Sequence, residues 1–280
     1  MKCIKKVIDL HLHTTASDGV KTPEQLVEKA YQNGLAAIAV TDHDTIDGLL
    51  KAEEKASELG IELVKGVEFT TNYEPVMHII GLNLDIQNKE LKELLHKLDK
   101  SRLRLLAKAL RHVKENGIDV TAKDICEEKG TVTILNLKNY LLEKNMVETG
   151  DDLDLDLLSI INEWRAVTPS PSECIQLIHG CNGIAILAHP ALLSREYVHL
   201  KQIVLQLKQY GLDGIEVIHP SHTTQERAIF KTWAEELKLF QSGGSDYHGV
   251  GKRIHTGSSN PEDDIYVSYS FLEEMKGCNV

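Results

Sequence analysis

Short apolar runs alternate with amphipathic segments along most of this chain. The segments between several of these runs place apolar residues at helical spacing. Strands that alternate with helices predict an α/β fold built on a parallel sheet or barrel. The apolar runs of strand length cover residues 7–13, 36–41, 61–70 and 76–84, and later residues 184–188, 214–218 and 239–243.

Two predicted helices start at the same sequence signal. Thr22 with Gln25, and Ser170 with Glu173, can each form a capping box, and a proline follows each cap residue at the first helical position. We expect Asp44 to cap the helix after the second strand. Such signals mark where the chain leaves a strand and begins a helix.

Residues 89–165 follow a different pattern. Leucines recur at helical spacing over a long stretch, and no convincing strand interrupts the helical segments. We therefore expect an all-helical insert over residues 89–165. It separates the first part of a barrel, residues 1–88, from the second part, residues 166–280.

The net charge of −11 over 280 residues limits the classes of partner. General nucleic-acid-binding surfaces are basic, so we expect no stable complex with nucleic acid. A small anionic substrate remains compatible with an acidic chain, because bound divalent cations reverse the local field.

The five cysteines are scattered and form no Cys-x-x-Cys pair. This pattern fits reduced thiols in a cytoplasm better than a disulfide scaffold or a cysteine zinc site. The sequence also shows no apolar signal-peptide core and no apolar run long enough to span a membrane. We therefore expect a cytoplasmic protein without a membrane partner.

Metal-ligand side chains follow nearly every predicted strand at its carboxyl end. On the first strand, His11 and His13 share one face with Asp9, and Leu10 and Leu12 take the other. Carboxyl ends of parallel strands meet on one face of such a fold, so these side chains should converge. Imidazole and carboxylate without thiolate suit zinc, iron and manganese. The full set is His11, His13, Asp18, Asp42, His43, Glu68, His78, His189, His219, His222, Asp246 and His248.

Most of these residues form an ordered set of motifs that resembles a known family. The motifs are His11-x-His13, Asp18, Thr41-Asp42-His43-Asp44, Gly66-Val67-Glu68, His78-Ile79-Ile80-Gly81, Ala188-His189-Pro190 and Ser245-Asp246-Tyr247-His248-Gly249. Over most of the chain outside the insert, they resemble the PHP (polymerase and histidinol phosphatase) family. The resemblance implies a distorted seven-stranded β/α barrel with an all-helical insert and a trinuclear metal centre.

The resemblance also implies which side chains bind up to three divalent ions of manganese, iron or zinc. Glu68 would bridge two of the ions. The three implied ligand groups are His11, His13, Glu68 and Asp246; Glu68, His78 and His189; and Asp18, His43 and His248.

Within the family, the chain is similar to stand-alone bacterial metal-dependent phosphoesterases. These include enzymes that remove a phosphate from nucleoside 3',5'-bisphosphates or trim the 5' ends of short RNA. The resemblance thus implies hydrolysis of a phosphomonoester in a small substrate, either a nucleotide or a short RNA end. A metal-bridging hydroxide would attack phosphorus, and the ions would absorb charge on the phosphoryl oxygens.

Two further residues are candidates for catalytic roles. His222 could protonate the leaving oxygen, as could a metal-bound water, and a loop histidine without a role is the plain alternative. Asp42 is a candidate catalytic group or one that orients a metal ligand, and its plain alternative is a turn residue.

The insert departs from close relatives in the segment 132–137. A Gly-Arg-Pro-His-like motif is usual there, and its arginine and histidine are missing from this chain. The substrate preference of relatives therefore does not transfer directly. A solvated surface is the default for basic residues in such an insert. The basic residues that could instead contact phosphate are Arg102, Arg104, Lys108, Arg111 and Arg165.

Two other functions compete with this interpretation. A histidinol-phosphate phosphatase is less favoured, because the motif at 188–190 and the mid-chain insert resemble the nucleotide-type branch. The alternative of another class is a non-catalytic metal-binding module that supports a partner. A degraded ligand set would favour that module, and the set in this sequence is complete.

Overall fold

A single eight-stranded sheet forms the centre of the computed structural model, which describes residues 6–125, 137, 140, 141, 144, 146, 155–249 and 265–277. The strands lie in the order β7-β6-β5-β4-β3-β2-β1-β8. Their bounds are β1 Val7–Leu12, β2 Ala37–Val40, β3 Glu62–Thr70, β4 His78–Leu82, β5 Ile184–Leu187, β6 Gly214–Ile218, β7 Phe240–Gly243 and β8 Val267–Ser268.

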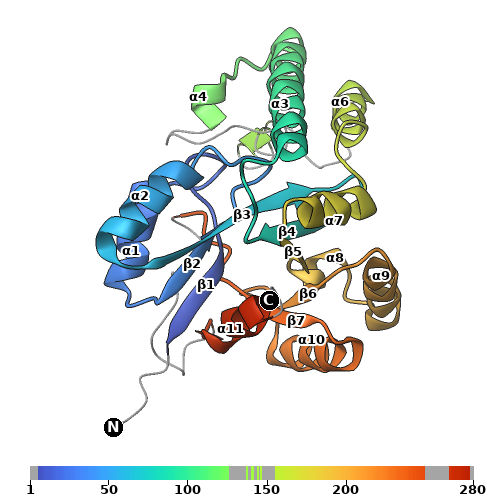
Figure 1. Cartoon of the computed structure of the whole chain (residues 1–280). Coiled ribbons are helices and arrows are strands. Elements are labelled where there is room, and N and C mark those ends of the chain that lie inside the picture. The colour runs from blue at the N-terminus through green and yellow to red at the C-terminus, as the bar shows by residue number, and fades with distance from the viewer. Residues whose placement is uncertain are drawn as a thin grey trace.

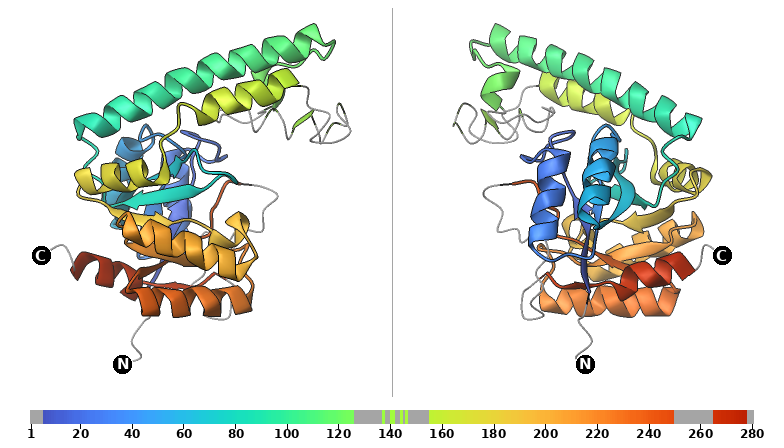
Figure 2. Two further views of the ribbon diagram at one scale, coloured as in Figure 1. Left: turned by 90° about the vertical axis from the view of Figure 1, so that its right-hand side faces the viewer. Right: turned by 60° about the vertical axis from the view of Figure 1, so that its left-hand side comes forward.

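Helices cover the outside of the curved sheet (Figure 1). In Figure 2, α3 and α6 lie side by side at one end of the molecule. Among the described residues, no helix has both the length and the apolar character that crossing a membrane requires. The helices are α1 Pro23–Gln32, α2 Leu49–Leu59, α3 Lys89–Glu115, α4 Ala122–Ile125, α6 Leu155–Arg165, α7 Pro171–Gly180, α8 Pro190–Leu193, α9 Tyr197–Gln209, α10 Thr224–Leu237 and α11 Ser270–Gly277.

Strand β4 runs against both of its neighbours, although the sequence pattern predicts a parallel arrangement. Thr70, the last residue of β3, pairs with His78, the first residue of β4. The pairs β1–β2, β2–β3, β5–β6 and β6–β7 are parallel. Because β4 is reversed, its amino end lies at the same edge of the sheet as the carboxyl ends of the other long strands.

The sheet curls so that β1 meets the segment after β7. The amide of Asp246 donates to the His11 carbonyl at 2.9 Å, and the amide of His13 donates to the Tyr247 carbonyl at 3.0 Å. Gly244 lies at this seam, where a Cβ would come within 2.4 Å of the His11 Cβ. The predicted α/β barrel is thus confirmed, with an eighth strand, the short antiparallel β8, beside β1.

Strand β1 is irregular, and this changes one expectation. Its register against β2 shifts between Asp9 and Leu12. Leu10 packs with the apolar cluster that contains Ile186, whereas Leu12 packs with the cluster that contains Leu26. The prediction that Leu10 and Leu12 share one apolar face is therefore wrong, because a bulge breaks the two-residue period.

Two of the predicted helix starts are confirmed, and one is wrong. Capping boxes at Thr22 and Ser170 begin α1 and α7. Helix α2 instead begins after Gly48, without a side-chain cap. Asp44 has a backbone φ of 51°, and its carboxylate accepts a hydrogen bond from the Thr70 amide at 2.9 Å. This residue therefore ties the loop after β2 to strand β3.

Helices α3, α4 and α6 lie within residues 89–165, and α3 and α6 share an apolar cluster of their own. Leu105 and Ala109 of α3 pack in it with Ile160 of α6. The first turns of α3 join the barrel instead, because Leu91 and Leu95 pack with Phe69. The division of the chain at 89 and 165 stays a prediction. Apart from Leu137, the altered segment 132–137 lies outside the described residues.

The seam of the barrel gives a first prediction. In Gly244→Ala, the new methyl group would meet the Cβ and amide nitrogen of His11, at 2.4 and 2.6 Å. Because the backbone must move to make room, we expect the free energy of unfolding, measured in urea, to fall by about 1–3 kcal/mol. Gly180→Ala is the matched control, because no atom of the described residues outside its own helix lies within 4 Å of its added Cβ. Equal stability of the two variants would contradict this account of the seam.

Candidate metal centre

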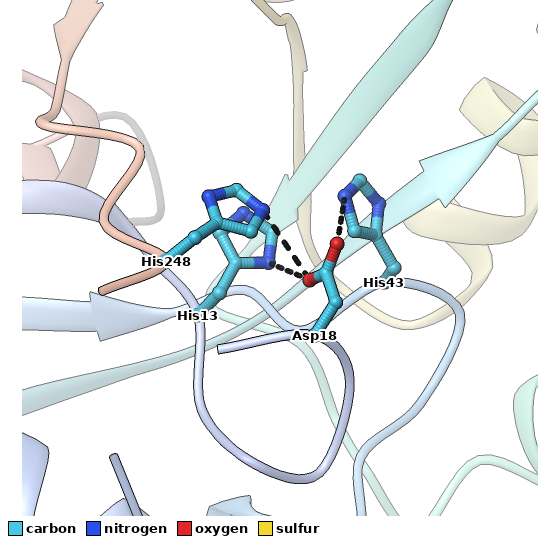
Figure 3. Close-up of side chains that lie close together, drawn as sticks. All are labelled: His13, Asp18, His43 and His248. Carbon is cyan, nitrogen blue, oxygen red and sulfur yellow. Dashed lines mark ion pairs between the residues drawn. The ribbon is translucent and has the colours of Figure 1, made fainter. Parts of the chain in front are cut away.

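The first group of candidate ligands lies around Asp18 (Figure 3). Asp18 Oδ1 lies 3.3 Å from His248 Nε2 and 3.7 Å from His13 Nδ1, and Asp18 Oδ2 lies 4.0 Å from His43 Nε2. The four side chains come from the end of β1, the loop that follows it, the loop after β2 and the segment after β7. Their ligand atoms all lie within 4.8 Å of one another, so they could hold one ion.

A second group lies at the end of β1, on the other side of His13. Glu68 Oε2 lies 3.1 Å from His11 Nε2 and 3.2 Å from His13 Nε2. Asp246 Oδ1 lies 3.5 and 3.3 Å from the same two nitrogens. These four residues also have ligand atoms within 4.8 Å of one another. They match the first group that the family resemblance implies.

Glu68 also reaches the third group. Its Oε1 lies 3.0 Å from His78 Nδ1 and 2.9 Å from His189 Nε2. His43 Nδ1 lies 3.3 Å from Glu68 Oε2, so the group within 4.8 Å is His43, Glu68 and His78. His189 Nε2 lies 3.4 Å from His78 Nδ1. The structure thus brings together all nine implied ligands, and His43 lies between two groups.

The backbone near the site adopts a conformation that non-glycine residues rarely take. His189 has a φ of 26° directly after β5, and Asp246 has a φ of 51° after β7. Both residues are buried. Positive φ at such residues costs free energy of the order of 1–3 kcal/mol and concentrates at functional sites. Here it turns both side chains toward the same edge of the barrel.

Asp42 organises the loop that carries Asp18. Its Oδ1 accepts hydrogen bonds from the Thr14 amide and the Ser17 hydroxyl, and its Oδ2 accepts one from the Thr14 hydroxyl, each at 2.7 Å. These bonds favour an orienting role over direct contact with substrate. A catalytic role for Asp42 stays a prediction.

Burial and mutual contact shift the pKa values of the candidate ligands. Burial lowers the pKa of His11 and His13, but nearby carboxylates outweigh it and raise the pKa of His13 to about 10 and that of His11 well above its usual value. Burial would raise the pKa of Glu68, yet the surrounding histidines lower it well below its usual value. Burial lowers the pKa of His43 to about 3. The centre is thus a tight arrangement of opposite charges.

Among the described residues, several buried ring nitrogens of the centre have no partner in hydrogen-bond geometry, although two of them lie near Glu68. Both ring nitrogens of His13 are in this state, as are Nδ1 of His43 and Nδ1 of His189. Buried polar atoms without partners are rare in folded proteins and call for a specific cause. Imidazoles and carboxylates at these distances suit divalent manganese, iron or zinc. The side chains therefore fit the ions that the family resemblance implies.

Two buried residues at the site were missed or ranked low from the sequence. Glu216 lies inside β6, and its Oε1 is 3.1 Å from His11 Nδ1. His219 follows β6, and its Nε2 lies 3.4 Å from Asp246 Oδ2. A single carboxylate in the apolar run Gly214–Ile218 was the available signal for Glu216. The sequence places His219 among the metal-ligand side chains but outside the three implied ligand groups.

His222 is buried beside His219, with ring centroids 5.2 Å apart. Its Nδ1 donates to the Val217 carbonyl at 3.0 Å, so its Nε2 carries the lone pair when the ring is neutral. Burial lowers the pKa of His222 to about 4. A neutral ring has no proton to give from Nε2 at pH 7. These facts favour water over His222 as the proton donor, and the role of His222 stays a prediction.

The basic residues of the insert differ in what they contact. Arg104 and Lys108 pair with Glu163 of α6, and Arg111 is exposed. Arg165 lies 2.7 Å from Glu74 in the loop before β4. The side chain of Arg102 is 11% exposed and pairs with Asp99. Arg102 also opposes the rise that burial causes in the pKa of Asp44, the residue after His43.

The raised pKa values predict that metal binding depends on pH. The metal-free protein should hold protons on both ring nitrogens of His13 at pH 7, because nearby carboxylates raise the pKa of His13 to about 10. A metal binds only neutral imidazole, so binding must release protons, and affinity should rise with pH up to about 10. Calorimetry in two buffers of different ionisation enthalpy measures this release. Equal heats in both buffers at pH 7 would contradict it.

The chain is similar to several proteins of known activity. It is 34% identical to a 5'-3' exoribonuclease of Haemophilus influenzae, over 87% of this chain and 90% of that protein. It is 27% identical to a 3',5'-nucleoside bisphosphate phosphatase of Chromobacterium violaceum, over 88% of each chain. It is 31% identical to a phosphoribosyl 1,2-cyclic phosphate 1,2-diphosphodiesterase of Eggerthella lenta, over 90% of this chain and 98% of that protein.

Two solved structures share the whole architecture. One, assigned to the metal-dependent phosphoesterases and from Bifidobacterium adolescentis, has a TM-score of 0.76 and 27% identity, and the match covers 98% of this chain and 96% of that one. The other is an amidohydrolase of Chromobacterium violaceum with bound sulfate and no metal. It has a TM-score of 0.73 and 26% identity, and the match covers 91% of this chain and 92% of that one.

The family model described as the PHP domain matches residues 9–237, which include the barrel strands β2 to β6 and seven of the nine implied ligands. The predicted class of activity, a metal-dependent phosphoesterase, is confirmed by these relatives. This chain belongs to the PHP domain family.

Proposed function

We propose that this protein hydrolyses a phosphomonoester of a nucleotide or of a short RNA end, with divalent ions bound by the nine candidate ligands. The observation that carries the proposal is the position of Glu68. Its two oxygens lie within 3.3 Å of ring nitrogens of five histidines, so one carboxylate can serve two neighbouring ions. The named activities of the exoribonuclease and the bisphosphate phosphatase support a nucleotide substrate.

The bound ions would supply an activated water at neutral pH and neutralise the phosphoryl oxygens. The chain's own residues hold the geometry in which this chemistry takes place. Asp42 fixes the loop of Asp18 through its bonds to Thr14 and Ser17.

We further propose that the helical insert contributes to phosphate binding through Arg102. The lysines and the other arginines of α3 are exposed, and Arg104 and Lys108 pair with Glu163 of α6, whereas the Arg102 side chain is largely buried. Among the described residues its Nε has no hydrogen-bond partner, and its charge acts on Asp44 beside the candidate metal centre. A guanidinium binds phosphate oxygens with two parallel hydrogen bonds.

We place the protein in the cytoplasm. Cys174 and Cys181 are both free and buried, which fits a reducing compartment. A histidinol-phosphate phosphatase remains the alternative activity, and a non-catalytic metal-binding module remains the alternative of another class.

The main test is phosphate release from a panel of phosphoesters with manganese, iron or zinc supplied. The panel contains a nucleoside 3',5'-bisphosphate, a short 5'-phosphorylated RNA, a cyclic ribose phosphate and histidinol phosphate. We expect the first two to be hydrolysed fastest. Fastest turnover of histidinol phosphate would replace the proposed substrate class. Tight metal binding without any hydrolysis would favour the non-catalytic module.

The paired replacement His11→Ala with His13→Ala should abolish hydrolysis. Loss of two ligands removes several kcal/mol of transition-state stabilisation, which lowers kcat/KM at least about a thousandfold. The control is His179→Ala, because His179 pairs with Asp213 at 2.8 Å and contacts none of the candidate ligands in the described structure. Activity that survives the double replacement would overturn the proposed function.

Arg102→Ala should lower kcat/KM by about 10- to 100-fold, because a hydrogen bond to a charged group contributes about 1.5–3 kcal/mol. Arg111→Ala is the matched control on the same helix, since Arg111 is exposed. The steady-state rates of both variants are compared on the same nucleotide. Equal rates for the two variants would remove Arg102 from the substrate site.

A further inference from the structure

Glu216 is a fully buried carboxylate, and each of its two oxygens contacts a different candidate metal ligand. Its Oε1 lies 3.1 Å from the Nδ1 of His11, and its Oε2 accepts a hydrogen bond of 2.8 Å from the backbone amide of His189. His11 lies in the second group of candidate ligands, and His189 contacts the other oxygen of Glu68. One side chain of β6 therefore touches residues on both sides of Glu68.

The contact with His11 gives the Nδ1 proton of that histidine an acceptor when Nε2 binds a metal. A neutral imidazole carries one N–H and one lone pair. Both ring nitrogens of His11 face a carboxylate at 3.1 Å, Nδ1 facing Glu216 and Nε2 facing Glu68. When Nε2 gives its lone pair to a metal beside Glu68 and Asp246, Nδ1 keeps its proton and donates it to Glu216. Metal-ligating histidines usually donate their second nitrogen in this way, and the contact raises ligand basicity.

The contact with His189 acts on the backbone. His189 has a φ of 26°, a conformation that carries strain in a residue with a side chain. The hydrogen bond from its amide to Glu216 holds the peptide in this orientation, with His189 Nε2 2.9 Å from Glu68 Oε1. Loss of the acceptor would leave a buried amide without a partner and release the turn.

A fourth ion among His11, Glu216 and His219 is the competing interpretation, since their ligand atoms lie within 4.8 Å of one another. The hydrogen bonds disfavour it. His219 Nδ1 accepts from the Ser221 amide at 3.1 Å, so its Nε2 carries the proton when neutral and faces Asp246 Oδ2 at 3.4 Å. His11 and His219 thus each turn an N–H toward a carboxylate.

We propose that Glu216 is a positioning residue of the metal centre: it fixes the His11 tautomer and the His189 turn, and so sets metal affinity without binding a metal itself. This inference rests on the proposed function, because it takes His11 and His189 as metal ligands. It adds a residue from β6 to a centre otherwise built on other elements.

The test measures Zn²⁺ binding to metal-free protein by competition with a chelator, together with the number of ions bound. Glu216→Gln keeps the size of the side chain but offers one acceptor oxygen for two N–H groups. We expect the affinity to fall about 10- to 100-fold with the number of bound ions unchanged. Glu216→Asp keeps both acceptor oxygens, so its Zn²⁺ affinity should fall less than that of Glu216→Gln. The Asp variant also provides a test if the Gln variant does not fold.

Glu226→Gln is the matched control. Glu226 is also fully buried, but it accepts hydrogen bonds from the Thr223 amide and hydroxyl at the start of α10. Its replacement should lower the unfolding temperature of the metal-free protein and leave Zn²⁺ affinity unchanged. If Glu216 had only a structural role, Glu216→Gln would likewise lower the unfolding temperature and leave Zn²⁺ affinity unchanged.

Three results separate the outcomes. Wild-type affinity in Glu216→Gln would overturn the inference and leave the proposed function standing. Loss of one bound ion, with the others bound as in the wild type, would show that Glu216 is a ligand and would also overturn it. A wild-type protein that binds no Zn²⁺ would contradict the proposed function, and this inference with it.

Discussion

The buried carboxylate of Glu68 is the interaction on which the rest of the site depends. An isolated charge in a protein interior costs several kcal/mol, so it needs partners of opposite charge or a metal. Glu68 has five histidines within 3.3 Å, contributed by β1, β4 and the segments after β2 and β5. With bound ions the same side chain becomes a bridge. The strands of the barrel therefore place positive partners or metal ligands around the buried charge of Glu68.

The topology explains how these histidines reach one point. Parallel strands deliver residues at their carboxyl ends, and the reversed β4 delivers His78 from its amino end. The seam at Gly244 lets the segment after β7 lie against β1, so that Asp246 reaches His11 and His13. Positive φ at His189 and Asp246 completes the convergence. Local strain is thus balanced by the hydrogen bonds and charges of the centre.

Much of this arrangement could be predicted from the sequence, because strand, helix and ligand spacings are local properties. The direction of β4 could not, since either direction gives the same apolar pattern. Asp44 resembled a helix cap, but its carboxylate bonds to Thr70, a partner far along the chain. Glu216 was missed because one carboxylate within an apolar strand gives no spacing signal. The contacts that escaped prediction are those made between distant segments.

The most direct measurement is the anomalous diffraction of zinc in crystals of this protein. The account predicts peaks on both sides of Glu68, with each of its oxygens about 2.0–2.2 Å from an ion and histidine nitrogens at similar distances. Peaks confined to surface residues, with none beside Glu68, would contradict it.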